Sequence, residues 1–162
     1  MFKQGDFERV IELWERAREI DPNDYQTPTI SMSVYEQLGD RDKLLQAAKD
    51  GARAASLYVE QHPENARAWM LGAHAYLELG ERDKAMQFAE AALQAEPDSE
   101  GTHYNGACFY AAAGEIEKAL DCLERSMKFI DTDWMDNDAD LDPLRGEPRF
   151  QALMARMRSK TT

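Results

Sequence analysis

Residues 65–100, NARAWMLGAHAYLELGERDKAMQFAEAALQAEPDSE, contain the pattern that decides the fold. The first half carries three packing residues at spacings of four and three, the rhythm of one buried helix face: Trp69, Ala73 and Tyr76. Gly80 ends this helix, and a second apolar stripe follows over 83–95 until Pro97 stops it. The stretch therefore predicts a helical hairpin. Because one hairpin cannot bury both of its apolar faces, we expect copies of it elsewhere in the chain.

The spacing of the glycines reveals these copies. Gly114 lies 34 residues after Gly80, and Gly39 lies 34 residues after Gly5. The step from Gly39 to Gly80 is 41 residues, seven more than the period. Seven residues are about two helical turns, so a helix can absorb them without rotating its buried face. We expect this insertion within 41–61, where an Ala-rich run lengthens the second helix.

A unit of this length and residue pattern resembles the tetratricopeptide repeat. Five positions of the central hairpin carry the resemblance: Trp69, Ala73, Tyr76, Ala85 and Pro97. Two positions depart from it, because Gly72 stands where Leu is usual and Ala89 stands where an aromatic residue is usual. The resemblance implies an all-α fold, a right-handed superhelical solenoid of helix-turn-helix repeats with a C-terminal capping helix.

We expect a single tetratricopeptide domain over 1–162. Its predicted parts are a half repeat (1–24), a repeat with an extended second helix (25–63), two further repeats (64–97 and 98–131), and an acidic loop with a capping helix (132–162). In the half repeat, Gly5 and Asp6 are expected to form the turn between helices. The first helix of that repeat would precede Met1, so we expect a chain cut from a longer protein or one that begins late.

The last part of the chain predicts the capping helix. Pro148 suits the first turn of this helix. Four apolar side chains lie on one of its faces: Phe150, Leu153, Met154 and Met157. The last repeat of a solenoid otherwise leaves an apolar surface in water, which such a helix covers.

Two segments carry a closer resemblance. YNGACFYAAAGEIEKALDCLERSM (104–127) and DADLDPLRGEPRFQALMARM (138–157) resemble the C-terminal tetratricopeptide end of bacterial multidomain signalling proteins. These include adenylate or guanylate cyclase-like proteins and serine/threonine kinases. The resemblance implies a regulatory or scaffolding region, and neither a cyclase nor a kinase domain lies in these residues.

In a solenoid of this type the first helices of successive hairpins line a concave groove. The candidate groove residues are Gln26, Thr29, Ser33, Glu36, Arg67, Met70, His74, Leu77, Tyr104, Asn105 and Cys108. The matching positions lack the Lys and Asn pairs with which related chaperone-binding domains hold a C-terminal carboxylate. We therefore expect another kind of peptide or protein segment as the partner.

Charge and hydropathy exclude several partners. The formal net charge is −12, whereas phosphate binding needs clustered Lys and Arg, so we expect neither nucleic acid nor an anionic membrane surface. No stretch approaches the roughly 18 apolar residues of a membrane span, and no secretion signal is found at the start. We expect a cytoplasmic protein.

The motifs of catalysis are missing from the sequence. It has no phosphate-binding loop, no nucleophile elbow and no zinc-protease motif, and its three histidines do not cluster. We expect no enzymatic activity, no cofactor and no metal site. Cys108 and Cys122 are predicted to be reduced packing residues on inward helix faces.

The acidic loop leaves one alternative open. Five acidic residues from Asp136 to Glu147 have the spacing of an EF-hand calcium loop, with Asp138, Asp140 and Asp142 between them. Leu141 stands where that loop needs Gly. The other interpretation is that these carboxylates cap short helices and offset the arginines of the tail.

The half repeat predicts self-association. Four apolar side chains of its helix share one face that a preceding helix would cover: Phe7, Val10, Ile11 and Trp14. A homodimer through this face is one solution. Taken together, the sequence predicts a non-catalytic scaffold that binds a peptide or protein segment in the concave groove. The alternative is the regulatory C-terminal region of a larger bacterial signalling enzyme of the cyclase or kinase type.

Overall fold

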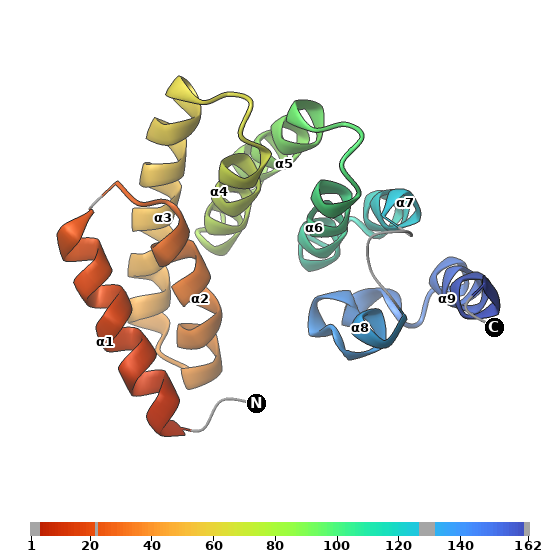
Figure 1. Ribbon diagram of the computed structural model, residues 1–162, viewed down its shortest axis with the longest axis horizontal. Coiled ribbons are helices and arrows are strands. Elements are labelled where there is room, and N and C mark those ends of the chain that lie inside the picture. Colours follow the sequence, from red (N-terminus) through yellow and green to blue (C-terminus); the bar gives the residue numbers. More distant parts are fainter. Residues whose placement is uncertain (1–3, 22, 127–131, 161–162) are drawn as a thin grey trace. The chain divides into compact units, whose positions relative to one another are not determined.

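The protein is represented by a computed structural model that describes residues 4–21, 23–126 and 132–160 (Figure 1). The described residues form helices and no strand. The helices are α1 (Gln4–Ile20), α2 (Gln26–Leu38), α3 (Arg41–Gln61), α4 (Ala66–Glu78), α5 (Arg82–Ala95), α6 (Glu100–Ala112), α7 (Ile116–Arg125), α8 (Thr132–Asn137), the 3-10 helix η1 (Ala139–Leu144) and α9 (Pro148–Lys160). Within this part of the chain, no helix is both long enough and apolar enough to cross a bilayer.

Backbone contacts divide the chain into two compact units. Unit 1 is Met1–Ala92 and unit 2 is Leu93–Thr162. In unit 1, α3 packs against both α2 and α4, as Figure 1 shows. In unit 2, α6 packs against α7 and η1, and α9 contacts α7 and α8.

Three glycines close the first helices of the hairpins. Gly39, Gly80 and Gly114 have φ values of 68°, 77° and 75°, the left-handed conformation that favours glycine. At each one the next residue donates its N–H to a carbonyl five residues back, as Glu81 does to Tyr76 at 3.0 Å. The predicted turns at these three positions are therefore confirmed.

The turn predicted at the N-terminus is wrong. Helix α1 begins at Gln4, so Gly5 and Asp6 lie inside it. Among the described residues, positive φ values occur only at the three hairpin glycines, and Gly5 is not one of them. A glycine inside a helix costs about 1 kcal/mol relative to Ala but does not by itself end the helix.

The extended second helix is observed in α3. This helix has 21 residues, whereas α5 has 14 and α7 has 10. Asp40 caps its start, because the Asp40 side chain accepts a hydrogen bond from the N–H of Lys43 at 3.1 Å. Gly51 allows α2 to approach closely, since a Cβ at this position would lie 2.7 Å from Oγ1 of Thr29.

The N-terminal face is partly covered by unit 1 itself. Ile11 packs against a buried cluster formed by Tyr35, Leu44 and Ala47. Trp14 is half-buried. The side chains of the other two predicted face residues, Phe7 and Val10, lie outside the described residues.

The capping helix of unit 2 is confirmed. All four predicted apolar side chains of α9 are buried: Phe150, Leu153, Met154 and Met157. Beside them η1 contributes Leu141 and Leu144, both with no exposed surface. The segment after α7 is therefore a structural part of unit 2.

Arg149 fastens α9 to α7. Its guanidinium donates to Glu117 at 3.0 Å, Asp121 at 2.6 Å and Glu124 at 3.1 Å, which stand on one face of α7. The hydrogen bond from Arg149 lowers the pKa of the Glu124 carboxyl. Exposed ion pairs contribute at most about 1 kcal/mol each, so this network orients α9 while the buried apolar face holds it.

Candidate functional site

The accessible part of the predicted groove lies on α2 and α4 of unit 1. At its start, Nε of Arg67 donates to Oε1 of Gln26 at 3.1 Å, which links the first turns of the two helices. Both side chains are exposed, and so are Ser33 and Glu36. We call this surface the α2–α4 face. Its exposed members are polar, so it offers hydrogen-bond donors and acceptors to a partner.

His74 and Leu77 are the half-buried members of the α2–α4 face. Burial lowers the pKa of His74 from 6.5 to about 4. At neutral pH the imidazole is therefore uncharged, and it can act as one donor and one acceptor.

Acidification from pH 6.5 to 4 is expected to destabilise unit 1 through His74. The unfolded imidazole takes up a proton near a pKa of about 6.5, whereas the folded one takes it up only near about 4. Between these values protons bind preferentially to the unfolded chain, so stability falls as pH falls. Melting temperatures of His74→Gln at pH 6.5 and 4.5 should differ less than those of the unmodified protein.

His62→Gln, at a half-buried histidine beside Glu64, is the control that should keep the full difference. Equal slopes in all three proteins would contradict the assignment to His74.

Two predicted groove residues of unit 1 are not accessible. Thr29 is buried, and its hydroxyl donates to the carbonyl of Tyr25 at 2.7 Å. Met70 is buried as well, with 4% of its surface exposed. Neither side chain is accessible to a partner in this structure, because both are used in packing unit 1.

The predicted groove residues of unit 2 are mostly covered by the tail. Tyr104 and Cys108 are buried, and α6 contacts η1. The Tyr104 hydroxyl donates a hydrogen bond to the Asp138 carboxylate, and burial followed by this bond raises the pKa of Tyr104. Of the three predicted groove residues in unit 2, only Asn105 is exposed. The chain thus occupies with its own acidic segment the surface on which a partner was expected.

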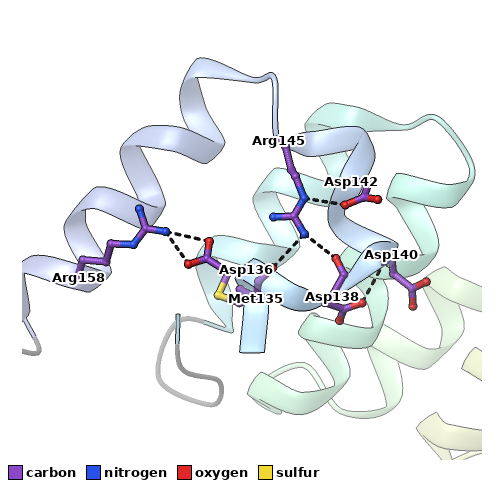
Figure 2. Close-up of polar contacts among 7 residues, drawn as sticks. All are labelled: Met135, Asp136, Asp138, Asp140, Asp142, Arg145 and Arg158. Carbon is purple, nitrogen blue, oxygen red and sulfur yellow. Dashed lines mark hydrogen bonds and ion pairs between the residues drawn. The ribbon is translucent and has the colours of Figure 1, made fainter. Parts of the chain in front are cut away.

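The acidic segment forms a network of caps and ion pairs (Figure 2). Arg158 binds the Asp136 carboxylate at 2.6 Å and 2.8 Å. Arg145 binds Asp142 at 2.6 Å and donates to the carbonyl of Asp138 at 3.0 Å. Oδ1 of Asp138 accepts from the N–H of Asp140 at 3.0 Å and so caps η1. Two of the five carboxylates of the calcium alternative are therefore paired with arginines, which favours the interpretation of caps and ion pairs.

A cavity beside this network was not predicted from the sequence. Its volume is about 690 Å³, and its lining residues are Asp133, Trp134, Asn137, Asp138, Ala139 and Asp140. Trp134 is 62% exposed, which is unusual for so large an apolar ring. The sequence offered one signal for this cavity, the tryptophan within a run of aspartates. A large apolar side chain is unusual in a solvated acidic loop.

Comparisons with known proteins identify the repeat. A family model described as tetratricopeptide repeat matches residues 45–100, and no curated protein gives a significant match. Among solved structures, TTC0263, a thermophilic TPR protein of Thermus thermophilus, is 19% identical, with 97% of this chain and 91% of that chain covered and a TM-score of 0.52.

A crystal structure of MamA protein is 18% identical, covers 98% of this chain and 86% of that chain, and has a TM-score of 0.50. Identities this low show the fold and nothing about partners. The predicted fold class is thereby confirmed: residues 45–100 contain a recognised tetratricopeptide repeat, and the chain has the all-helical fold of tetratricopeptide solenoids.

Proposed function

We propose that this chain is a non-catalytic scaffold that binds a peptide or protein segment on the α2–α4 face. The tetratricopeptide fold supports a role in protein–protein interaction. The observation that carries the more specific proposal is the exposed Gln26–Arg67 pair, which joins two adjacent first helices at the start of the face. Repeat proteins of this class present such surfaces for binding.

The proposal is confined to unit 1 because unit 2 covers its own equivalent surface. Tyr104 and Cys108 are buried beneath the acidic segment, whereas Ser33, Glu36 and Arg67 are exposed. The face combines an arginine, an acidic residue and a neutral histidine. A partner segment with both polar side chains and free backbone groups would match this mixture.

Selection from a displayed peptide library, followed by calorimetry with the selected peptide, tests the proposal. Arg67→Glu should weaken binding at least about tenfold, since a reversed charge at an interface costs more than about 1.4 kcal/mol. Arg67 is exposed, so this variant should keep the helical circular dichroism of the parent.

The matched control is Lys49→Glu, which makes the same charge change at an exposed position of α3. It should leave binding unchanged. A peptide that binds Arg67→Glu as tightly as the parent, or that loses affinity equally for both variants, would place the binding surface elsewhere.

A second candidate is regulation of a catalytic domain within a longer signalling protein. It is supported by the resemblance of 104–127 and 138–157 to the end regions of such proteins, which the comparisons do not show. The reading frame in the genome tests it. A cyclase or kinase domain encoded upstream in the same frame would support it, and a stop codon just before Met1 would remove it.

Self-association through α1 also stays a prediction. Leu13 and Ile20 are 57% and 80% exposed, so the helix presents apolar surface besides Ile11 and Trp14. Light scattering at about 100 micromolar, well above a micromolar dissociation constant, should give the mass of a dimer. A monomeric mass at that concentration would exclude it.

A further inference from the structure

Three potential metal ligands come together in unit 2. Cys108 stands on α6, Asp138 immediately precedes η1, and Asp140 lies within η1. Each residue offers one ligand atom, the sulfur of Cys108 or a carboxylate oxygen of an aspartate. These three atoms all lie within 4.8 Å of one another. The sequence separates the cysteine from the aspartates by about thirty residues, and the contact of α6 with η1 unites them.

The thiol of Cys108 is buried against the two carboxylates. It is 6% exposed and forms no disulfide. Its sulfur lies close to the carboxylates of Asp138 and Asp140. A sulfur atom beside two carboxylate oxygens is a set of electron-pair donors that a metal ion can share.

The electrostatics of the cluster favour a cation. Burial, followed by the negative charges of Asp138 and Asp140, raises the pKa of Cys108. The geometry itself favours a cation, because two carboxylate oxygens and the sulfur lie within 4.8 Å of one another. A divalent ion between the three groups would lower the pKa of Cys108, because its charge offsets both carboxylates and favours the thiolate.

The two carboxylates of the cluster are open to solvent through the cavity. Asp138 and Asp140 line the space of about 690 Å³, together with Asn137 and Trp134. In Figure 2 the carboxylates of Asp138 and Asp140 point away from the Arg145 guanidinium, which binds the opposite side of the segment. Water from this cavity can complete the coordination of an ion.

We propose that Cys108, Asp138 and Asp140 form a binding site for one thiophilic divalent cation of the Zn²⁺ or Cd²⁺ class. A ligand set of one sulfur and two carboxylates suits these ions, whereas Ca²⁺ and Mg²⁺ prefer oxygen ligands alone. The site is separate from the proposed binding surface, the α2–α4 face, which lies in unit 1.

The geometry needs only side-chain adjustment. Zinc binds sulfur at about 2.3 Å and carboxylate oxygen at about 2.1 Å, which places tetrahedral ligands roughly 3.5 Å apart. The ligand atoms lie within 4.8 Å of one another, so they must approach by at most about 1.3 Å. Asp140 is exposed, while the Tyr104 hydroxyl holds the Asp138 carboxylate in place as an outer-shell donor.

Binding is coupled to a proton. The S–H bond of Cys108 breaks, a sulfur–metal bond forms, and the proton passes to the solvent. One proton released per ion makes the apparent affinity about tenfold weaker for each unit by which the pH is lowered.

Cadmium titration of the untagged, reduced and chelator-treated chain of 162 residues tests the site. The ultraviolet absorption of sulfur-to-cadmium charge transfer should rise and saturate at one Cd²⁺ per chain. Zn²⁺ should compete for the site, and an equal concentration of Ca²⁺ should not. Cys108→Ser should lose the absorption, and Asp140→Asn should need at least about tenfold more Cd²⁺.

Cys122→Ser is the matched control, since Cys122 is the other buried free cysteine and belongs to no such cluster among the described residues. It should bind Cd²⁺ as the parent does. Absorption that persists in Cys108→Ser, disappears in Cys122→Ser, or never develops in the parent would overturn the proposal. Equal affinity of Asp140→Asn and the parent would also overturn it, because it would mean adventitious binding to a thiol alone. Asp140 is exposed, so this variant gives a result even if Cys108→Ser fails to fold.

Discussion

Replacing Gly72 by Leu will destabilise unit 1 by about 3 kcal/mol or more, even though Leu is the usual residue at this position of the repeat. A Cβ at Gly72 would lie 2.7 Å from Cδ1 and 2.8 Å from Cε1 of Phe88, and 3.0 Å from Cβ of Ala55. The Phe88 ring cannot move away easily, because it packs edge-on between Trp69 and Tyr76 with centroid distances of 4.7 Å and 4.9 Å. Urea unfolding followed by circular dichroism measures the loss.

Gly146→Ala is the control for this experiment. A Cβ at Gly146 meets no heavy atom within 4 Å, and its φ lies outside the left-handed region. The control should stay within about 0.5 kcal/mol of the parent. The Gly72→Ala, Phe88→Leu double variant should lose less stability than the sum of the two single variants, since contacting residues are coupled. An unfolding midpoint of Gly72→Leu equal to that of the parent would show that Phe88 is not held in this position.

Leu141→Ala is expected to cost unit 2 about 2 to 5 kcal/mol. Leu141 has no exposed surface, and η1 packs against α6 and α7, so truncation leaves a cavity in the core. Fluorescence of Trp134, with Trp14 and Trp69 replaced by Phe, reports on unit 2 alone during urea unfolding.

The same substitution at Leu57 provides the comparison. Leu57 is 44% exposed on α3 of unit 1, so Leu57→Ala, followed by circular dichroism instead of Trp134 fluorescence, should lose clearly less stability than Leu141→Ala. An unchanged unfolding midpoint of Leu141→Ala would mean that the segment after α7 is detachable and contributes nothing to the core. It would also weaken the proposed metal site, which depends on the contact between η1 and α6.

The hairpins could be predicted because their determinants are local. Helical periodicity and the left-handed turns at Gly39, Gly80 and Gly114 depend on residues a few positions apart. The seven-residue insertion corresponds to about two helical turns and lengthens α3 without rotating its buried face. The apolar face of α9 likewise needed no tertiary information. Gly5 shows the limit of this reasoning, because a glycine permits a turn without imposing one.

The accessibility of the candidate groove residues could be predicted only in part. Its exposed members in unit 1 follow from helix register, but the register does not tell which small polar residue turns back to its own backbone, as Thr29 does. In unit 2 the positions of Tyr104 and Cys108 match the groove register, yet the tail covers them. The Tyr104–Asp138 hydrogen bond joins residues 34 positions apart, a separation that no periodic pattern encodes.

The sequence by itself determined the repeats, the extended α3 and the capping helix, since propensity, periodicity and turn chemistry act over a few residues. Only the tertiary structure decided which candidate groove residues stay accessible, why glycine fits at position 72 beside Phe88, and how Cys108 meets Asp138 and Asp140. These features depend on close packing between segments distant in the chain, where the space left by one side chain determines what its neighbour can be.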